Sequence, residues 1–205
     1  MNIINEIIEP DSFYHIYNRG INSCNIFQHK ENYSFFLKQF SKYMNAVVDV
    51  YAYCLMPNHF HFLIKVKSEQ ELETFVNVLN FNKGASKEKG LHASTNIVSK
   101  QFAKFISSYS QAFNKTNNRH GALLESPFKR IRIDTEDYLK NLIIYIHLNP
   151  EDIKMNYENY MFSSYFSLLS NAKTNLKRQD VLELFQNADN FIFCHKQPSK
   201  LDFKF

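Results

Sequence analysis

Two histidines near the middle of the chain have the type and spacing needed to bind a divalent metal ion. His59 and His61 lie in the run HFHFLIKV, which has the β-rich composition of a strand. Because side chains alternate across a strand, both imidazoles lie on one face, about 7 Å apart along the strand, and can chelate one ion. The other face is uniformly apolar: Phe60, Phe62, Ile64 and Val66. The alternative interpretation is that these histidines are half-exposed sheet residues that bind no metal. It stays open because a motif of two histidines is short.

Tyr145 and Asn149 lie four residues apart in a helical pattern over residues 135–149. At about 100° per residue, this helix has two neighbouring stripes. The polar stripe comprises Tyr138, Asn141, Tyr145 and Asn149, and the apolar stripe comprises Leu139, Ile143 and Ile146. Residues at this spacing are surface neighbours, so a metal held by Asn149 would lie beside the Tyr145 hydroxyl. The alternative is an ordinary helix end before Pro150, with one of twelve tyrosines nearby.

The elements that must position these residues follow an α+β order. Strand patterns cover residues 13–19, 47–56 and 59–66, and helical patterns cover residues 32–44, 72–81, 101–115 and 135–149. Residues 122–133 are extended, and the two glycines and four lysines of residues 83–100 predict a solvated loop. The β-α-β-β-α order favours a small antiparallel sheet with helices on one face and a site on the other.

Composition and charge restrict the class of protein. A chain of 205 residues forms one compact core, with at most a substantial appendage. Its net charge of +4 permits a nucleic-acid partner without requiring one. Three cysteines without a CxxC motif argue against a disulfide framework or a zinc ribbon. With no signal-like start and no apolar segment of about 20 residues, we expect a cytoplasmic protein without a membrane partner.

Basic residues just before the Tyr145 helix suggest a DNA track. Lys129, Arg130 and Arg132 share one extended segment, in which Lys129 and Arg130 point to opposite sides. Arg130 and Arg132 are the preferred pair. Arg19 and Lys65 are secondary candidates, and Tyr14, Tyr53 and Tyr138 could stack on bases. The alternative is a run of solvated charges.

Five motifs in order resemble the single-tyrosine HUH transposase family: YHIYNRG, YCLMPNHFHFLI, SPFKRIRI, YLKNLIIYIHLNP and FSSY. The nearest group is the REP-associated, IS200-like branch, and the resemblance covers roughly residues 13–165. It implies a ferredoxin-like (RRM-like) palm and a DNA transposase that nicks and rejoins single-stranded or hairpin DNA through a covalent 5′-phosphotyrosine. It further implies that Tyr145 attacks the DNA. His59, His61 and Asn149 then bind the divalent ion, Mg²⁺ or Mn²⁺.

We expect residues 1–150 to form the HUH transposase catalytic domain. Residues 151–205 form a C-terminal helical and aromatic extension on the same domain, with short helices near residues 163–169 and 179–187. The family includes monomers and homodimers, and the extension favours a monomer.

Two other functions share these features. A non-catalytic DNA or RNA hairpin-binding protein is suggested because HFHFLIKV resembles an RRM strand, although that function gives the paired histidines no role. A hydrolytic metal-dependent nuclease would use the same ion without a covalent intermediate. A covalent protein–DNA adduct distinguishes the three.

Overall fold

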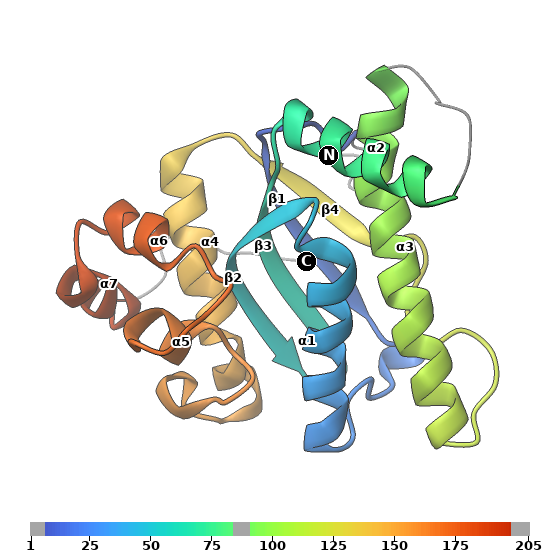
Figure 1. Cartoon of the computed structure of the whole chain (residues 1–205). Helices are drawn as coiled ribbons and strands as arrows, with labels where there is room; N and C mark the ends of the chain where they lie inside the picture. Colours follow the sequence, from blue (N-terminus) through green and yellow to red (C-terminus); the bar gives the residue numbers. More distant parts are fainter. Residues whose placement is uncertain (1–6, 84–90, 198–205) are drawn as a thin grey trace.

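The computed structural model describes residues 7–83 and 91–197, and within these ranges one antiparallel sheet has the strand order β2-β3-β1-β4 (Figure 1). The strands are β1 (Phe13–Arg19), β2 (Val48–Met56), β3 (His59–Val66) and β4 (Lys129–Ile133). The helices are α1 (Lys30–Met44), α2 (Glu69–Lys83), α3 (Leu91–Thr116), α4 (Glu136–Leu148), α5 (Tyr165–Leu169), α6 (Arg178–Leu184) and α7 (Ala188–His195). The predicted α+β class is confirmed.

The first face of the sheet packs against α1 and α3, which lie to its right in Figure 1. Its core is mainly aromatic: the Phe40 and Phe62 rings stack with centroids 4.2 Å apart, and Phe36 meets Phe105 edge to face at 4.7 Å. Phe60 and Phe62 are both buried there, so the alternation expected along β3 is confirmed. This alternation turns His59 and His61 to the opposite face.

The second face differs from the expectation that helices cover only one side. Helix α4 and the helices after it lie against this face, to the left in Figure 1. Leu63 and Cys54 are buried there with Leu142, Ile143 and Ile146 of α4. The physical reason is that the histidine face is itself apolar beyond His61, so its burial stabilises the fold.

The prediction of a loop over residues 83–100 is wrong from Leu91 onward, where α3 begins. Ile97, Val98 and Phe102 are buried and continue the apolar stripe of α3 toward its N-terminus. Lysines and serines around these residues concealed that stripe in the sequence. Residues 84–90, which belong to the same prediction, lie outside the described residues.

Helix α4 begins and ends where its sequence predicts. The Thr135 side chain caps it by accepting a hydrogen bond from the Tyr138 backbone N–H at 3.3 Å. The α-helix ends at Leu148, and a 3-10 turn over Asn149–Ile153 follows with Pro150 at its start. Asn149 is therefore held at a fixed helix end.

The C-terminal helices hold α4 in place through buried polar contacts. The Nδ1 atom of His147, on α4, lies 2.9 Å from Nε2 of His195, on α7. The Nε2 atom of His147 lies 2.7 Å from the Ser164 hydroxyl. Helix α7 follows the two short helices that the sequence predicts within residues 151–205, and the sequence pattern does not predict it.

No helix in the described ranges combines the length and apolar character needed to cross a bilayer. Cys24, Cys54 and Cys194 are free thiols, in agreement with the expectation that no disulfide framework is present.

Candidate active site

A cavity of about 240 Å³ lies where β1 and β3 meet the end of α4. Its lining includes all four residues predicted to carry the chemistry: His59, His61, Tyr145 and Asn149. The sheet register brings the two strands together, with Tyr17 opposite His61 and Arg19 opposite His59. Helix α4 supplies the tyrosine, and the 3-10 turn that follows it supplies the asparagine.

Hydrogen bonds orient the side-chain amide of Asn149 and the imidazole of His59 toward each other. Asn149 Nδ2 donates to the Tyr145 carbonyl at 2.9 Å, which turns its Oδ1 atom to His59 Nε2, 3.3 Å away. His59 Nδ1 lies 2.7 Å from Asn58 Oδ1, and an N–H donated there leaves a lone pair on Nε2. In that tautomer the Nε2 lone pair of His59 faces the Asn149 oxygen, an arrangement that a shared cation would stabilise. The donor chemistry fits a divalent ion.

His61 completes the donor set. Its ring meets the Tyr145 ring edge to face, with centroids 5.6 Å apart, and the His59 ring at 5.1 Å. Within residues 7–83 and 91–197, no group of three or more His, Cys, Asp or Glu side chains is arranged to hold a metal. A metal in this cavity therefore depends on the amide oxygen of Asn149 as well as on the two imidazoles.

The Tyr145 hydroxyl belongs to a half-buried side chain. Burial raises its pKa to about 12, the nearby Asp152 carboxylate adds to the rise, and an interaction with the Asn149 side chain opposes it. The phenol is accordingly protonated at neutral pH. A positive charge beside its oxygen would favour ionisation and make it a better nucleophile.

Comparison with known families decides the class of protein. The family model described as "Transposase IS200 like" matches residues 11–112. The chain belongs to the IS200-like transposase family. The matched region contains β1 and β3, with His59 and His61, and ends before α4, which carries Tyr145, and before the 3-10 turn that begins at Asn149.

Solved structures resemble this IS200-like chain at low identity. The REP-associated tyrosine transposase bound to a REP hairpin has a TM-score of 0.49 and 13% identity, covering 82% of this chain and 84% of that one. A bacterial tRNA(His) guanylyltransferase (Thg1)-like protein in complex with GTP has a TM-score of 0.39 and 11% identity, covering 92% and 74%. No curated protein matches the sequence.

The basic residues predicted to follow DNA are divided between the two faces of the sheet. Lys129 lies opposite Tyr17, and both line the cavity together with Arg19. Arg130 and Arg132, the preferred pair, lie opposite Ile16 and Tyr14 on the other face. The structure therefore brings Lys129 and Arg19 to the cavity and does not bring Arg130 and Arg132 there.

Ion pairs and ring contacts involve four of these cations. Lys129 pairs with Glu125, 3.3 Å away, and its Nζ atom lies 5.8 Å from the Tyr17 ring centroid. Arg132 pairs with Glu9 and with Asp134. The Arg130 guanidinium lies 5.2 Å from the Phe128 ring centroid. Lys65 is on the histidine face, beyond His61, with its Nζ atom 5.8 Å from the Phe13 ring centroid.

Tyr17 is a residue of this cavity that sequence reasoning missed. Its ring stacks with His15 at 4.8 Å and with His61 at 5.8 Å. Alternation along β1 from Arg19 places Tyr17 on the same face and could have revealed it. Tyr14, proposed for base stacking, is fully buried, and its hydroxyl donates to the Ile7 carbonyl, so it cannot stack on a base.

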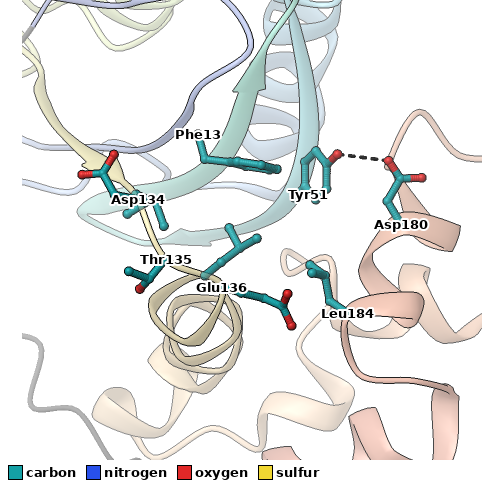
Figure 2. A pocket seen from close by; sticks show the side chains of 9 residues that line it. Phe13, Tyr51, Asp134, Thr135, Glu136, Asp180 and Leu184 are labelled. Atoms are coloured by element: carbon teal, nitrogen blue, oxygen red, sulfur yellow. Dashed lines mark hydrogen bonds between the residues drawn. The ribbon is translucent and has the colours of Figure 1, made fainter.

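A second cavity, of about 330 Å³, lies farther along the same face of the sheet (Figure 2). Phe13 and Tyr51 form its wall, and the Tyr51 hydroxyl donates to Asp180 at 3.0 Å. Among the residues that the structure describes, its lining includes the carboxylates of Asp134, Glu136 and Asp180 and no Lys or Arg, so it would repel phosphate. Beside Tyr145, the carboxylates of Glu125 and Asp152 are matched by Arg19 and Lys129. The cavity around Tyr145 is therefore the candidate active site.

Proposed function

We propose that this IS200-like chain is a DNA transposase that nicks and rejoins single-stranded or hairpin DNA through a covalent 5′-phosphotyrosine on Tyr145. The observation that carries the proposal is the convergence of Tyr145, His59, His61 and Asn149 on one cavity from β3, from α4 and from the turn after α4. A non-catalytic binding protein would not require a tyrosine hydroxyl beside a cation-binding donor set.

The covalent step balances with the groups of the chain and the DNA. The Tyr145 oxygen attacks the scissile phosphorus and loses its proton, and the bond between phosphorus and the 3′ oxygen breaks. The 3′ oxygen takes a proton and leaves as a hydroxyl. Because the ester is exchanged for another ester, a second 3′-hydroxyl can reverse the step and join strands without ATP. A water nucleophile would instead make cleavage irreversible.

His59, His61 and Asn149 would hold the divalent ion. When bound, Mg²⁺ or Mn²⁺ would polarise the phosphate and favour ionisation of the nearby phenol. Mixed imidazole and amide ligands suit Mn²⁺ better than Mg²⁺, which prefers oxygen. Lys129 and Arg19 line the same cavity, beside the carboxylates of Glu125 and Asp152, and would contact the phosphates of the DNA backbone.

The test is a search for the covalent adduct. The protein is incubated with a labelled DNA hairpin carrying a single-stranded flank and with Mn²⁺, then separated on a denaturing gel. We expect a labelled DNA band at the position of the protein. Protease treatment should remove this band. Cleaved DNA without an adduct would support the hydrolytic nuclease, and binding without cleavage would support the non-catalytic protein.

The division of basic residues between the two faces gives a prediction on DNA binding. Lys129→Ala should flatten the dependence of log affinity on log salt by about 0.7, the value for one lost phosphate contact on a single strand. Arg130→Ala, on the other face and one residue away, is the matched control and should leave the slope unchanged. Fluorescence anisotropy at several salt concentrations measures both. The reverse result would place the DNA on the face with Arg130 and Arg132.

A further inference from the structure

His15 is a fully buried histidine of β1 that lies behind the candidate metal site. Its Nε2 atom is 2.8 Å from Nδ1 of His61, close enough for a hydrogen bond. His15 does not line the cavity around Tyr145. It contacts the site through His61, so any role in the chemistry is exerted by way of that ring.

A contact between two imidazole nitrogens holds one proton, and its position decides what His61 can do. If His15 Nε2 carries the proton, His61 Nδ1 accepts it, and a neutral His61 then carries its own proton on Nε2. If His61 Nδ1 carries the proton, its lone pair is on Nε2 instead. Only the second tautomer makes His61 a ligand through Nε2.

Packing keeps the two rings in this relation. The His15 and His61 rings are nearly parallel, with an interplanar angle of 18°, and Tyr17 stacks with both. Neither ring can rotate without disrupting these contacts.

We propose that His15 is a positioning residue whose Nε2 accepts the hydrogen bond from His61 Nδ1, which holds His61 in the tautomer that places its lone pair on Nε2. The inference deepens the proposed function, because it assumes that the site with His59 and Asn149 binds a divalent ion. Partners of this kind commonly set both the tautomer and the orientation of a metal-binding histidine, and their loss typically weakens metal affinity about 10- to 100-fold.

The tautomer can be read directly in the metal-free protein. The protein is labelled with ¹⁵N-histidine, and two-bond ¹H–¹⁵N spectra distinguish Nδ1–H from Nε2–H. The His61 signals are assigned by their loss in His61→Gln. We expect the Nδ1–H form at His61, and finding the Nε2–H form would overturn the proposal. This measurement needs neither DNA nor cleavage, so it is independent of the transposase chemistry.

Metal affinity gives the second measurement. In His15→Phe, which keeps a buried ring but removes the acceptor, we expect Mn²⁺ to bind about 10- to 100-fold more weakly by electron paramagnetic resonance titration. His15→Gln restores an acceptor oxygen and should recover part of the affinity. The matched control is His195→Phe, which replaces one imidazole of the other buried histidine pair by a phenyl ring; neither histidine of that pair lines the cavity.

The outcomes separate the two proposals. Unchanged Mn²⁺ affinity in a folded His15→Phe protein would contradict the positioning role, as would equal losses in His15→Phe and His195→Phe. If His15→Phe does not fold, the wild-type tautomer decides. Mn²⁺ binding that depends on His15, in a protein that never forms a DNA adduct, would support the role of His15 and refute the transposase mechanism.

Discussion

Replacing Tyr145 with phenylalanine is expected to remove the covalent DNA adduct and to reduce cleavage on the order of 10⁴-fold or more, the scale seen when a nucleophile is deleted. The substitution deletes one oxygen and keeps the half-buried ring, including its edge-to-face contact with His61. We therefore expect DNA affinity and Mn²⁺ affinity to change little. A denaturing gel measures the adduct, and circular dichroism confirms the fold.

Two other tyrosines make this prediction specific. Tyr138 lies on the same helix, about 10 Å from Tyr145 along the axis, and does not line the cavity. Tyr17 lines the cavity from β1. Tyr138→Phe should retain the adduct, and mass spectrometry of the trapped complex should place the DNA on Tyr145. A DNA-linked peptide that contains Tyr17 or Tyr138 would refute the assignment.

The local patterns of the sequence predict the strands and helices that carry the candidate site. Alternation along residues 59–66 assigns His59 and His61 to one face, and the structure confirms that assignment. The helical pattern over residues 135–149, which ends before Pro150, likewise predicts the bounds of the Tyr145 helix. These features depend on neighbours in the chain, which a single sequence displays.

Contacts between distant segments could not be predicted in the same way. The approach of His59 to Asn149 joins residues 90 positions apart, and only the family resemblance suggests it. Arg19 of β1 was predicted, but His15 and Tyr17 were missed because strand register decides which side chains of β1 meet His61. Once register is known, His15 and Tyr17 fall beside His61, and Arg130 falls on the opposite face.

The burial of the second face of the sheet likewise depends on contacts between segments that are distant in the sequence. Leu63 follows the histidines on their own face and cannot remain exposed at low cost, so α4 and the C-terminal helices bury it. The buried contact between His147 and His195 ties the last helix to the helix that carries Tyr145. These C-terminal helices therefore support the geometry of the site, although none of residues 153–197 lines the cavity.

The second large effect is expected when the proposed metal ligands are replaced. At Mn²⁺ concentrations about 100 times its dissociation constant, binding to the folded state adds about 2.7 kcal/mol to the free energy of unfolding. For a chain of this size, that corresponds to a rise in melting temperature of roughly 5 to 10 °C. His59→Ala combined with His61→Ala should remove this rise and reduce cleavage to background, as measured by differential scanning calorimetry and the cleavage assay.

The buried contact between His61 and His15 complicates the double substitution, because its loss can destabilise the protein without any metal. His59→Ala alone avoids this, since His59 is half-buried at the end of β3 and faces Asn149. We expect it to remove most of the Mn²⁺-dependent rise while the melting temperature without metal changes little. His120→Ala, at an exposed position, is the matched control for loss of an imidazole. A His59→Ala protein that keeps both the full Mn²⁺ shift and full cleavage would exclude this histidine from the metal site, and with it the mechanism proposed for Tyr145.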